Sequence, residues 1–291
     1  MVLFHADDYG VNPKQAKRIL ACSQKGCLNS VSIMPNSDYL QQCMEQLHSD
    51  QKIFYAVHIN LAEGKCLADR RKLSLLVDRN GVFCQSFVSL LILSFLKRKK
   101  LQKQVQIECM AQIQEILKYA DANDKLRLDS HVHYHMIPAV FQGLCHACHA
   151  LGIEADAIRW PVEPLSPLVW NWKVIRQVHI NGFLKNMILR ICAVMDYPMV
   201  LKMGWKRKRA VFFGILFSGN MNWQIVQQLL PKYEAYAAKR RKNLEVLFHP
   251  GYIPQGGQLQ DEKFAEFYHS KNRKAEEHAL LKLRPGRERL C

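Results

Sequence analysis

Short apolar runs alternate with helix-like segments along nearly the whole chain, and this alternation restricts the fold more than any other feature. The runs expected as strands are 2–6, 30–34, 53–59, 126–131, 157–161, 210–217 and 244–248. The segments expected as helices are 14–24, 37–47, 102–120, 138–151, 221–230 and 264–283. Because strand–helix–strand repetition builds parallel sheets, we predict an α/β fold with mostly parallel strands. No repeat or linker divides the chain, so we expect a single domain over 1–291.

Two segments interrupt the alternation. Residues 64–100 and 165–210 are basic and apolar by turns and show no clear period. We expect both to be insertions in the single domain, where they would shape the mouth of a substrate site.

Ionisable side chains gather where the expected strands end. They are Asp7 and Asp8, His58, Asp129 and His131 with His133 and His135 following, Arg159, and His249. In parallel α/β folds the carboxyl ends of the strands meet on one face, which carries the active site. We therefore expect these distant residues to share one pocket.

The adjacent carboxylates of Asp7 and Asp8 favour a metal site. Two like charges oppose joint ionisation unless a cation lies between them. One aspartate and two imidazoles, with open positions for water, make a workable catalytic metal site. Other interpretations stay open: a helix-capping turn for Asp7-Asp8, a core histidine for His58 and a simple turn for His249. His131, His133 and His135 would share one side if their segment is extended.

Composition excludes several classes of protein. The 291 residues are 49% hydrophobic and 23% charged, as in globular proteins and unlike disordered ones. No apolar run reaches the ~18 residues of a membrane span. The N-terminus lacks the basic start and apolar core of a signal peptide, so we expect a cytoplasmic protein.

The chain carries 41 Lys+Arg and 25 Asp+Glu, a net charge of 41 − 25 = +16. The positive charge lies in the clusters 97–100, 206–209, 239–242 and 284–289. None is interleaved with aromatics as base stacking requires, so we expect no nucleic-acid partner. The cluster 206–209, beside Trp205, is the segment we expect to rest on an anionic membrane at its inner face.

The ten cysteines are irregularly spaced, and we expect reduced thiols. Cys145-His146-Ala147-Cys148-His149 matches the haem c attachment motif. Its surroundings indicate a packed helix, and attachment requires export, so we expect neither haem nor zinc there.

Four motifs together resemble a known family. They are Ala6-Asp7-Asp8-Tyr9-Gly10, Val57-His58-Ile59-Asn60-Leu61, the run from Asp129 to Pro138, and His249-Pro250-Gly251. They are similar to those of the YdjC-like carbohydrate deacetylases, also called the ChbG/HpnK family, from residue 2 to about 283. The blocks 158–164 and 213–219 resemble the hopanoid-associated HpnK branch more closely.

The resemblance implies a distorted TIM-like (β/α) barrel that removes the N-acetyl group from an acetylated amino sugar. It implies one divalent cation, Mg²⁺ or Zn²⁺, held by Asp8, His58 and His131, with Asp7 as general base. It also implies a homodimer. His5 departs from the family, which usually has a smaller polar residue there; it would crowd the metal pocket or point into the core.

Residue chemistry agrees with this activity. A metal can activate water and polarise an amide carbonyl, and Asp7 can accept the water proton. The departing amine needs a proton, for which His249 is the first candidate and His133 the second. We assign His133 and Arg159 to substrate binding, with Arg159 pairing with a sugar hydroxyl, a substrate phosphate or Asp7.

Two other functions remain open. One is a non-catalytic basic protein that binds anionic lipid or nucleic acid on a deacetylase-like scaffold. The other is a metal phosphoesterase, which uses similar ligands.

Overall fold

A computed structural model of the chain describes all residues except 49–52, 121–125, 170–171, 179, 207–208 and 284–291. Its centre is a seven-stranded sheet in the order β5-β4-β3-β2-β1-β7-β6. The strands are β1 (Val2–Tyr9), β2 (Ser30–Ile33), β3 (Phe54–Ile59), β4 (Arg127–Ser130), β5 (Ala157–Ile158), β6 (Val211–Phe213) and β7 (Leu244–Phe248). All six strand pairings are parallel, which confirms the predicted α/β fold. The sheet curls into a half-barrel with β5 and β6 at its edges.

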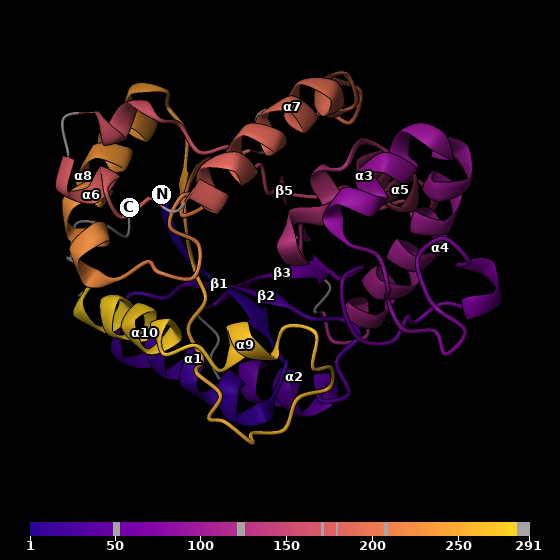
Figure 1. Ribbon diagram of the computed structural model, residues 1–291, viewed down its shortest axis with the longest axis horizontal. Coiled ribbons are helices and arrows are strands. Elements are labelled where there is room, and N and C mark those ends of the chain that lie inside the picture. Colours follow the sequence, from indigo (N-terminus) through magenta and orange to yellow (C-terminus); the bar gives the residue numbers. More distant parts are fainter. Residues whose placement is uncertain (49–52, 121–125, 170–171, 179, 207–208, 284–291) are drawn as a thin grey trace.

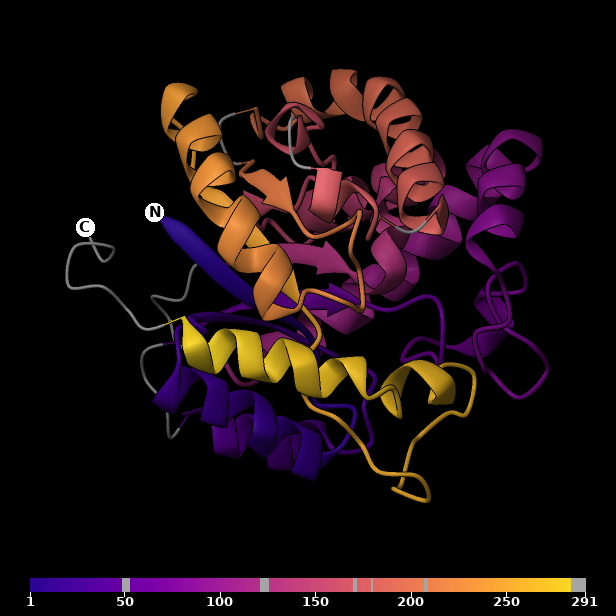
Figure 2. The same ribbon diagram turned by 60° about the vertical axis from the view of Figure 1, so that its left-hand side comes forward.

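Helices cover the sheet. They are α1 (Pro13–Lys25), α2 (Leu40–His48), α3 (Phe87–Leu96), α4 (Arg98–Leu117), α5 (Pro138–Ala150), α6 (Trp172–Ile175), α7 (Ile180–Lys202), α8 (Trp223–Lys239), α9 (Ala265–Tyr268) and α10 (Asn272–Lys282). Figure 1 shows α1, α2 and α10 below the sheet and α3, α5 and α7 above it. In Figure 2, α10 lies alongside α1.

The start of α1 shows how the sequence sets the edge of the site. The Asn12 side chain accepts hydrogen bonds from the backbone N–H groups of Lys14 and Gln15, and Pro13 occupies the first helical position. An Asn cap followed by proline is a strong helix start. The turn between β1 and α1 is thereby fixed directly after Asp7 and Asp8.

The segments expected as insertions contain ordered helices. Residues 64–100 include α3 and the start of α4, and 165–210 include the 23-residue α7. Trp205 is buried and packs edge-on against Phe141 at 6.0 Å, so its ring is not available to a membrane surface. Of the basic cluster beside it, 207–208 lie outside the described residues.

Two elements are shorter in the structure than the sequence predicts, because turns interrupt them. The strand expected over 210–217 stops at Phe213, where Gly214 has a φ of +131°. The N–H groups of Gly214, Ile215 and Leu216 then turn to the buried carboxylate of Glu163. The helix expected over 264–283 divides into α9 and α10.

Within the part of the chain that the structure describes, no helix combines the length and apolarity that crossing a bilayer requires.

Asp196 is a buried carboxylate on α7 from which a pH dependence follows. Neither of its oxygens has a hydrogen-bond partner among the described residues, and burial raises its pKa to about 8. The unfolded chain releases this proton near pH ~4. The folded state therefore holds the extra proton between these values, and stability falls as pH rises from about 4 to about 8.

We predict that Asp196→Asn, which removes the charge, raises the free energy of unfolding at pH 9 by about 1–3 kcal/mol. The gain should shrink towards pH 5, where the wild-type carboxyl is neutral in the folded state. Thermal unfolding at pH 5, 7 and 9 measures it. A gain that stays the same at all three values would contradict the assignment.

Candidate functional site

The carboxyl ends of three strands bring Asp8, His58 and His131 together. Asp8 is near the end of β1, His58 is in β3 and His131 directly follows β4. All three side chains are buried, and each offers one ligand atom within 4.8 Å of the other two. Asp8 Oδ1 lies 3.6 Å from His58 Nε2 and 2.9 Å from His131 Nδ1. The three predicted ligands therefore form one cluster.

Asp8 adopts an uncommon backbone conformation. Its φ is +63°, in the left-handed region that aspartate tolerates better than most residues. The register between β1 and β2 shifts between Ala6 and Tyr9, and Gln15 Nε2 donates a hydrogen bond to the Asp8 carbonyl at 2.6 Å. Its carboxylate also accepts from Arg273 Nη1 at 3.3 Å. These contacts hold the Asp8 carboxylate against the two histidines.

Each histidine is oriented by a second carboxylate. His58 Nδ1 donates to Asp129 Oδ1 at 2.6 Å, which leaves Nε2 directed at Asp8. His131 Nε2 lies 3.2 Å from Glu63 Oε1, and Glu63 accepts a hydrogen bond from the Tyr268 hydroxyl. Carboxylates that hold the outer nitrogen of an imidazole are typical of metal-binding histidines.

The charges suit a divalent cation. Burial by itself lowers the pKa of His58, but the carboxylates of Asp7 and Asp129 raise it to about 10. The pKa of His131 is likewise lowered by burial and raised by Asp8, to about 9. Metal binding would replace these protons. His58 Nε2, which lies 3.6 Å from Asp8 Oδ1, is buried without a hydrogen-bond partner among the described atoms, so the donor set fits a metal ion.

Asp7 lies beside this cluster with one oxygen held and one free. Arg159 Nη1 donates to its Oδ2 at 2.8 Å, and His58 Nε2 is 4.0 Å from the same oxygen. The other oxygen, Oδ1, is 3.5 Å from His5 Nε2. Burial raises the pKa of Asp7, against the opposing charge of Arg159.

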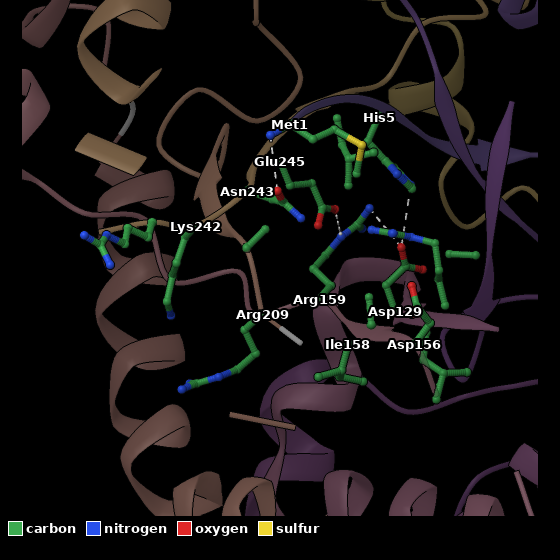
Figure 3. A pocket seen from close by; sticks show the side chains of 17 residues that line it. Met1, His5, Asp129, Asp156, Ile158, Arg159, Arg209, Lys242, Asn243 and Glu245 are labelled. Atoms are coloured by element: carbon green, nitrogen blue, oxygen red, sulfur yellow. Dashed lines mark hydrogen bonds and ion pairs between the residues drawn. The ribbon is translucent and has the colours of Figure 1, made fainter. Parts of the chain in front are cut away.

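Arg159 is enclosed by carboxylates. Its guanidinium lies 2.6 Å from Glu245, 2.8 Å from Asp7 and 2.9 Å from Asp129, and the residue is 3% exposed. Figure 3 shows it between Glu245 and Asp129. Pairing with Asp7 was one of the three expected contacts; its role in substrate binding stays a prediction.

Two further groups have metal-like spacing, His5-Asp129-Glu245 and Asp7-His58-Asp129. Arg159 contacts the carboxylates of both groups, so a resident cation already balances them. The cluster around Asp8 has no described ion pair with Arg159; Arg273 Nη1 contacts only Asp8 Oδ2, at 3.3 Å, and leaves Oδ1 facing the two histidines. This cluster is the better candidate for a metal.

His5 points into the core of the half-barrel. Its Nδ1 is 2.8 Å from Ser30 Oγ and its Nε2 is 2.5 Å from Ser32 Oγ. It lines a cavity of about 360 Å³ at the amino ends of the strands, where Met1 and Asn243 lie (Figure 3). His5 therefore lies in the core as one of the two expectations had it, and it also borders the site, because its Nε2 is 3.5 Å from Asp7 Oδ1.

The histidines after β4 do not form an extended segment. Val132 and His133 have φ values of +52° and +62°, so the extended backbone that would put all three histidines on one side is not present. His135 is held structurally, with Nδ1 2.6 Å from Ser130 Oγ and Nε2 3.0 Å from the Arg159 carbonyl. His133 is buried against Phe212, and burial lowers its pKa well below its usual value.

His249 follows β7 and packs against Phe267 at 5.1 Å. Its backbone N–H donates to the Glu276 carboxylate, and its Nδ1 is 3.9 Å from the same group. Burial lowers the pKa of His249 to about 3 and raises that of Glu276 to about 7. The imidazole is therefore neutral at pH 7.

An apolar pocket of about 240 Å³ adjoins the site. It is lined by Phe87, Val132, Asn181, Leu184, Lys185 and Ile188. Val132 directly follows His131, so this pocket lies beside the cluster. Burial lowers the pKa of Lys185 to about 8.

Sequence reasoning placed Asp129 in the shared pocket without giving it a function, and it did not identify Glu63, Glu245 or Arg273. Glu245 had a signal, because it is a charged residue inside an otherwise apolar strand. The signal for Asp129 was its position two residues before His131, at the end of the same strand. Glu63 and Arg273 are in segments that look like ordinary surface loop and helix.

Comparison with known proteins agrees with the geometry. A family described as "YdjC-like protein" matches residues 1–284. A carbohydrate deacetylase of Vibrio parahaemolyticus is 22% identical over 245 residues, 78% of this chain and 91% of that protein. One of Thermoanaerobacter pseudethanolicus is 31% identical over 86 residues, 30% of this chain and 34% of that protein. One of Mus musculus is 26% identical over 161 residues, which cover 54% of this chain and 49% of that protein. The last two matches span a third to a half of the relative's length.

The fold is similar to the solved structure of an Enterococcus faecalis protein named provisionally as a cellobiose-phosphate cleavage protein. The TM-score is 0.65 at 17% identity, over 97% of this chain and 91% of that chain. At this identity the likeness concerns the fold. Because the family match extends over residues 1–284, the chain belongs to the YdjC-like protein family.

Proposed function

We propose that the protein is a metal-dependent deacetylase that removes the N-acetyl group from an acetylated amino sugar. The observation that carries the proposal is the buried cluster of Asp8, His58 and His131 with the Asp7 carboxylate beside it. The carbohydrate deacetylases among its relatives support the choice of substrate.

A divalent cation held by Asp8, His58 and His131 would activate water and polarise the amide carbonyl. Zn²⁺ and Mg²⁺ are the candidates, and two imidazoles with one carboxylate favour Zn²⁺. Asp129 and Glu63 orient the two imidazoles from behind. The protein's own contribution is therefore a preorganised, buried set of donors.

Asp7 is the proposed general base. Arg159 holds its Oδ2 at 2.8 Å, so the carboxylate is fixed in place while Oδ1 stays free of hydrogen bonds among the described residues. Burial raises its pKa, which makes it a stronger acceptor of the water proton. In this view Arg159 acts through Asp7, and direct contact with the sugar stays an expectation.

The amine must be protonated as it leaves. His249 remains the first candidate for the acid and His133 the second. Both imidazoles are neutral at pH 7 in this structure, so either would have to take up the proton that Asp7 removes from water. The homodimer, the cytoplasmic location and the closer relation to the hopanoid-associated branch stay predictions.

We predict that Asp8→Asn and His131→Ala abolish stoichiometric binding of the divalent metal, because each removes a ligand. His146→Ala, which changes an exposed histidine on α5, is the control. Elemental analysis after dialysis against Zn²⁺ measures the metal content. Full metal content in both ligand variants would refute this cluster.

Asp7→Asn should keep the metal and the fold while lowering turnover by about 10²–10⁴-fold, because it removes the base. Acetate release from N-acetylglucosamine oligomers measures turnover. Phosphate release from sugar phosphates, assayed in parallel, distinguishes a phosphoesterase. Unchanged acetate release in the variant would remove Asp7 as base.

His249→Ala should slow N-deacetylation by about 10²-fold or more and retain the metal, because the amine leaves poorly without a proton. Hydrolysis of 4-nitrophenyl acetate, whose leaving group needs no proton, should change much less. If His133→Ala shows this dependence on the leaving group and His249→Ala does not, the acid is His133.

A further inference from the structure

Two helices beside the site expose large apolar side chains to solvent. On α3 these are Val88, Ile92, Phe95 and Leu96; on α7 they are Ile180, Leu184, Ile191, Val194 and Leu201. Each is between 50% and 82% exposed. We call these residues the α3/α7 face. Soluble proteins rarely leave so many large apolar groups together at the surface without a partner.

The two helices share a small core on their buried sides. Phe87 and Leu91 of α3 pack against a small core that includes Leu189 and Cys192 of α7. Phe87 from α3 and Leu184 from α7 both line the apolar pocket beside the cluster of Asp8, His58 and His131. Figures 1 and 2 both show α3 and α7 on the side of the sheet opposite α1. The face therefore reaches the pocket beside the candidate site through Leu184.

The sequence of α3 suits a surface other than water. Its ten residues, from Phe87 to Leu96, include only two buried ones, Leu90 and Ser94. Phe87, Leu91 and Leu93 pack against the core in part, but packing within the described chain does not explain the exposed Val88, Ile92, Phe95 and Leu96. A short apolar helix that lies in the interface of a bilayer has this character.

The charges around the face select the partner. Lys97, Arg98, Lys99 and Lys100 follow α3 directly and are all exposed. Helix α3 has no carboxylate, and the single carboxylate on α7, Asp196, is buried. A second copy of the face would meet it with like charges, whereas anionic lipid headgroups would complement it.

We propose that the α3/α7 face docks on an anionic lipid bilayer and turns the mouth of the site towards it. This surface differs from the 206–209 segment expected from the sequence. The apolar side chains enter the headgroup region, and the 97–100 cluster pairs with lipid charge. The proposal concerns a binding surface and does not depend on the chemistry at the metal cluster.

Sedimentation with vesicles tests the electrostatic part. The full chain should bind vesicles of phosphatidylcholine mixed with phosphatidylglycerol, more weakly at high salt, and should bind pure phosphatidylcholine poorly. The triple variant Lys97→Glu, Lys99→Glu, Lys100→Glu should lower the partition coefficient by about 100-fold. The matched control, Lys14→Glu, Lys17→Glu, Lys25→Glu, makes the same charge change on α1 and should have a much smaller effect.

The apolar part is tested by Ile92→Ser with Phe95→Ser, which should weaken vesicle binding by about tenfold. Phe54→Ser changes a side chain that is also 50% exposed, at the start of β3, and should leave binding unchanged. Because all three side chains are exposed, circular dichroism should show an intact fold in each variant.

Two results would overturn the proposal. One is vesicle binding that responds equally to the test and control variants. The other is a dimer in sedimentation velocity that Ile92→Ser with Phe95→Ser dissociates, because the face would then bind a second copy. Asp8→Asn separates this proposal from the deacetylase: it should lose acetate release from soluble sugar and bind vesicles like the wild type.

Discussion

In the interior of the half-barrel, the buried guanidinium of Arg159 balances the charge of three carboxylates. Arg159 follows the edge strand β5, yet its guanidinium contacts carboxylates on β1, β4 and β7. Those three carboxylates are nearly excluded from water, and each would be costly there without an opposite charge. Breaking a buried pair of this kind typically costs about 3–5 kcal/mol. The guanidinium therefore links β4 to β1 and β7, which are not its neighbours in the sheet, and holds the open sheet around a charged centre.

The same ion pairs order the site above them. Asp129 forms an ion pair with Arg159 through Oδ2 and accepts a hydrogen bond from His58 Nδ1 through Oδ1, so the tautomer of His58 is linked to the position of the arginine. Asp7 likewise lies between two partners, because its Oδ2 is 2.8 Å from Arg159 Nη1 and 4.0 Å from His58 Nε2. The donors that would face a metal are thus held from behind by groups that never touch it, as expected of metal sites whose outer contacts tune the ligands.

Much of this arrangement could be predicted from the sequence, because it follows from strand ends. Asp8, His58 and His131 were placed together by the rule that parallel strands present their carboxyl ends on one face, and the structure brings them within bonding range of one another. The rest depends on tertiary contacts. The three partners of Arg159 are up to 152 residues away, and no local pattern names them. The turn through Val132 and His133 needs positive φ at residues that rarely adopt it. Helices α3 and α7 lack an amphipathic period because their outer faces are apolar too.

The left-handed backbone at Asp8 has a further consequence. In a regular strand, consecutive side chains point to opposite faces, so Asp7 and Asp8 should have been separated by the sheet. Instead both carboxylates approach the same nitrogen, His58 Nε2, at 4.0 and 3.6 Å. The positive φ of Asp8 therefore allows two adjacent residues to place both of their carboxylates in the same site. Position 8 has two requirements: its side chain must offer a carboxylate oxygen, and its backbone must adopt a positive φ. Asparagine and glycine could keep the twist while altering the chemistry, whereas valine or isoleucine would disturb both.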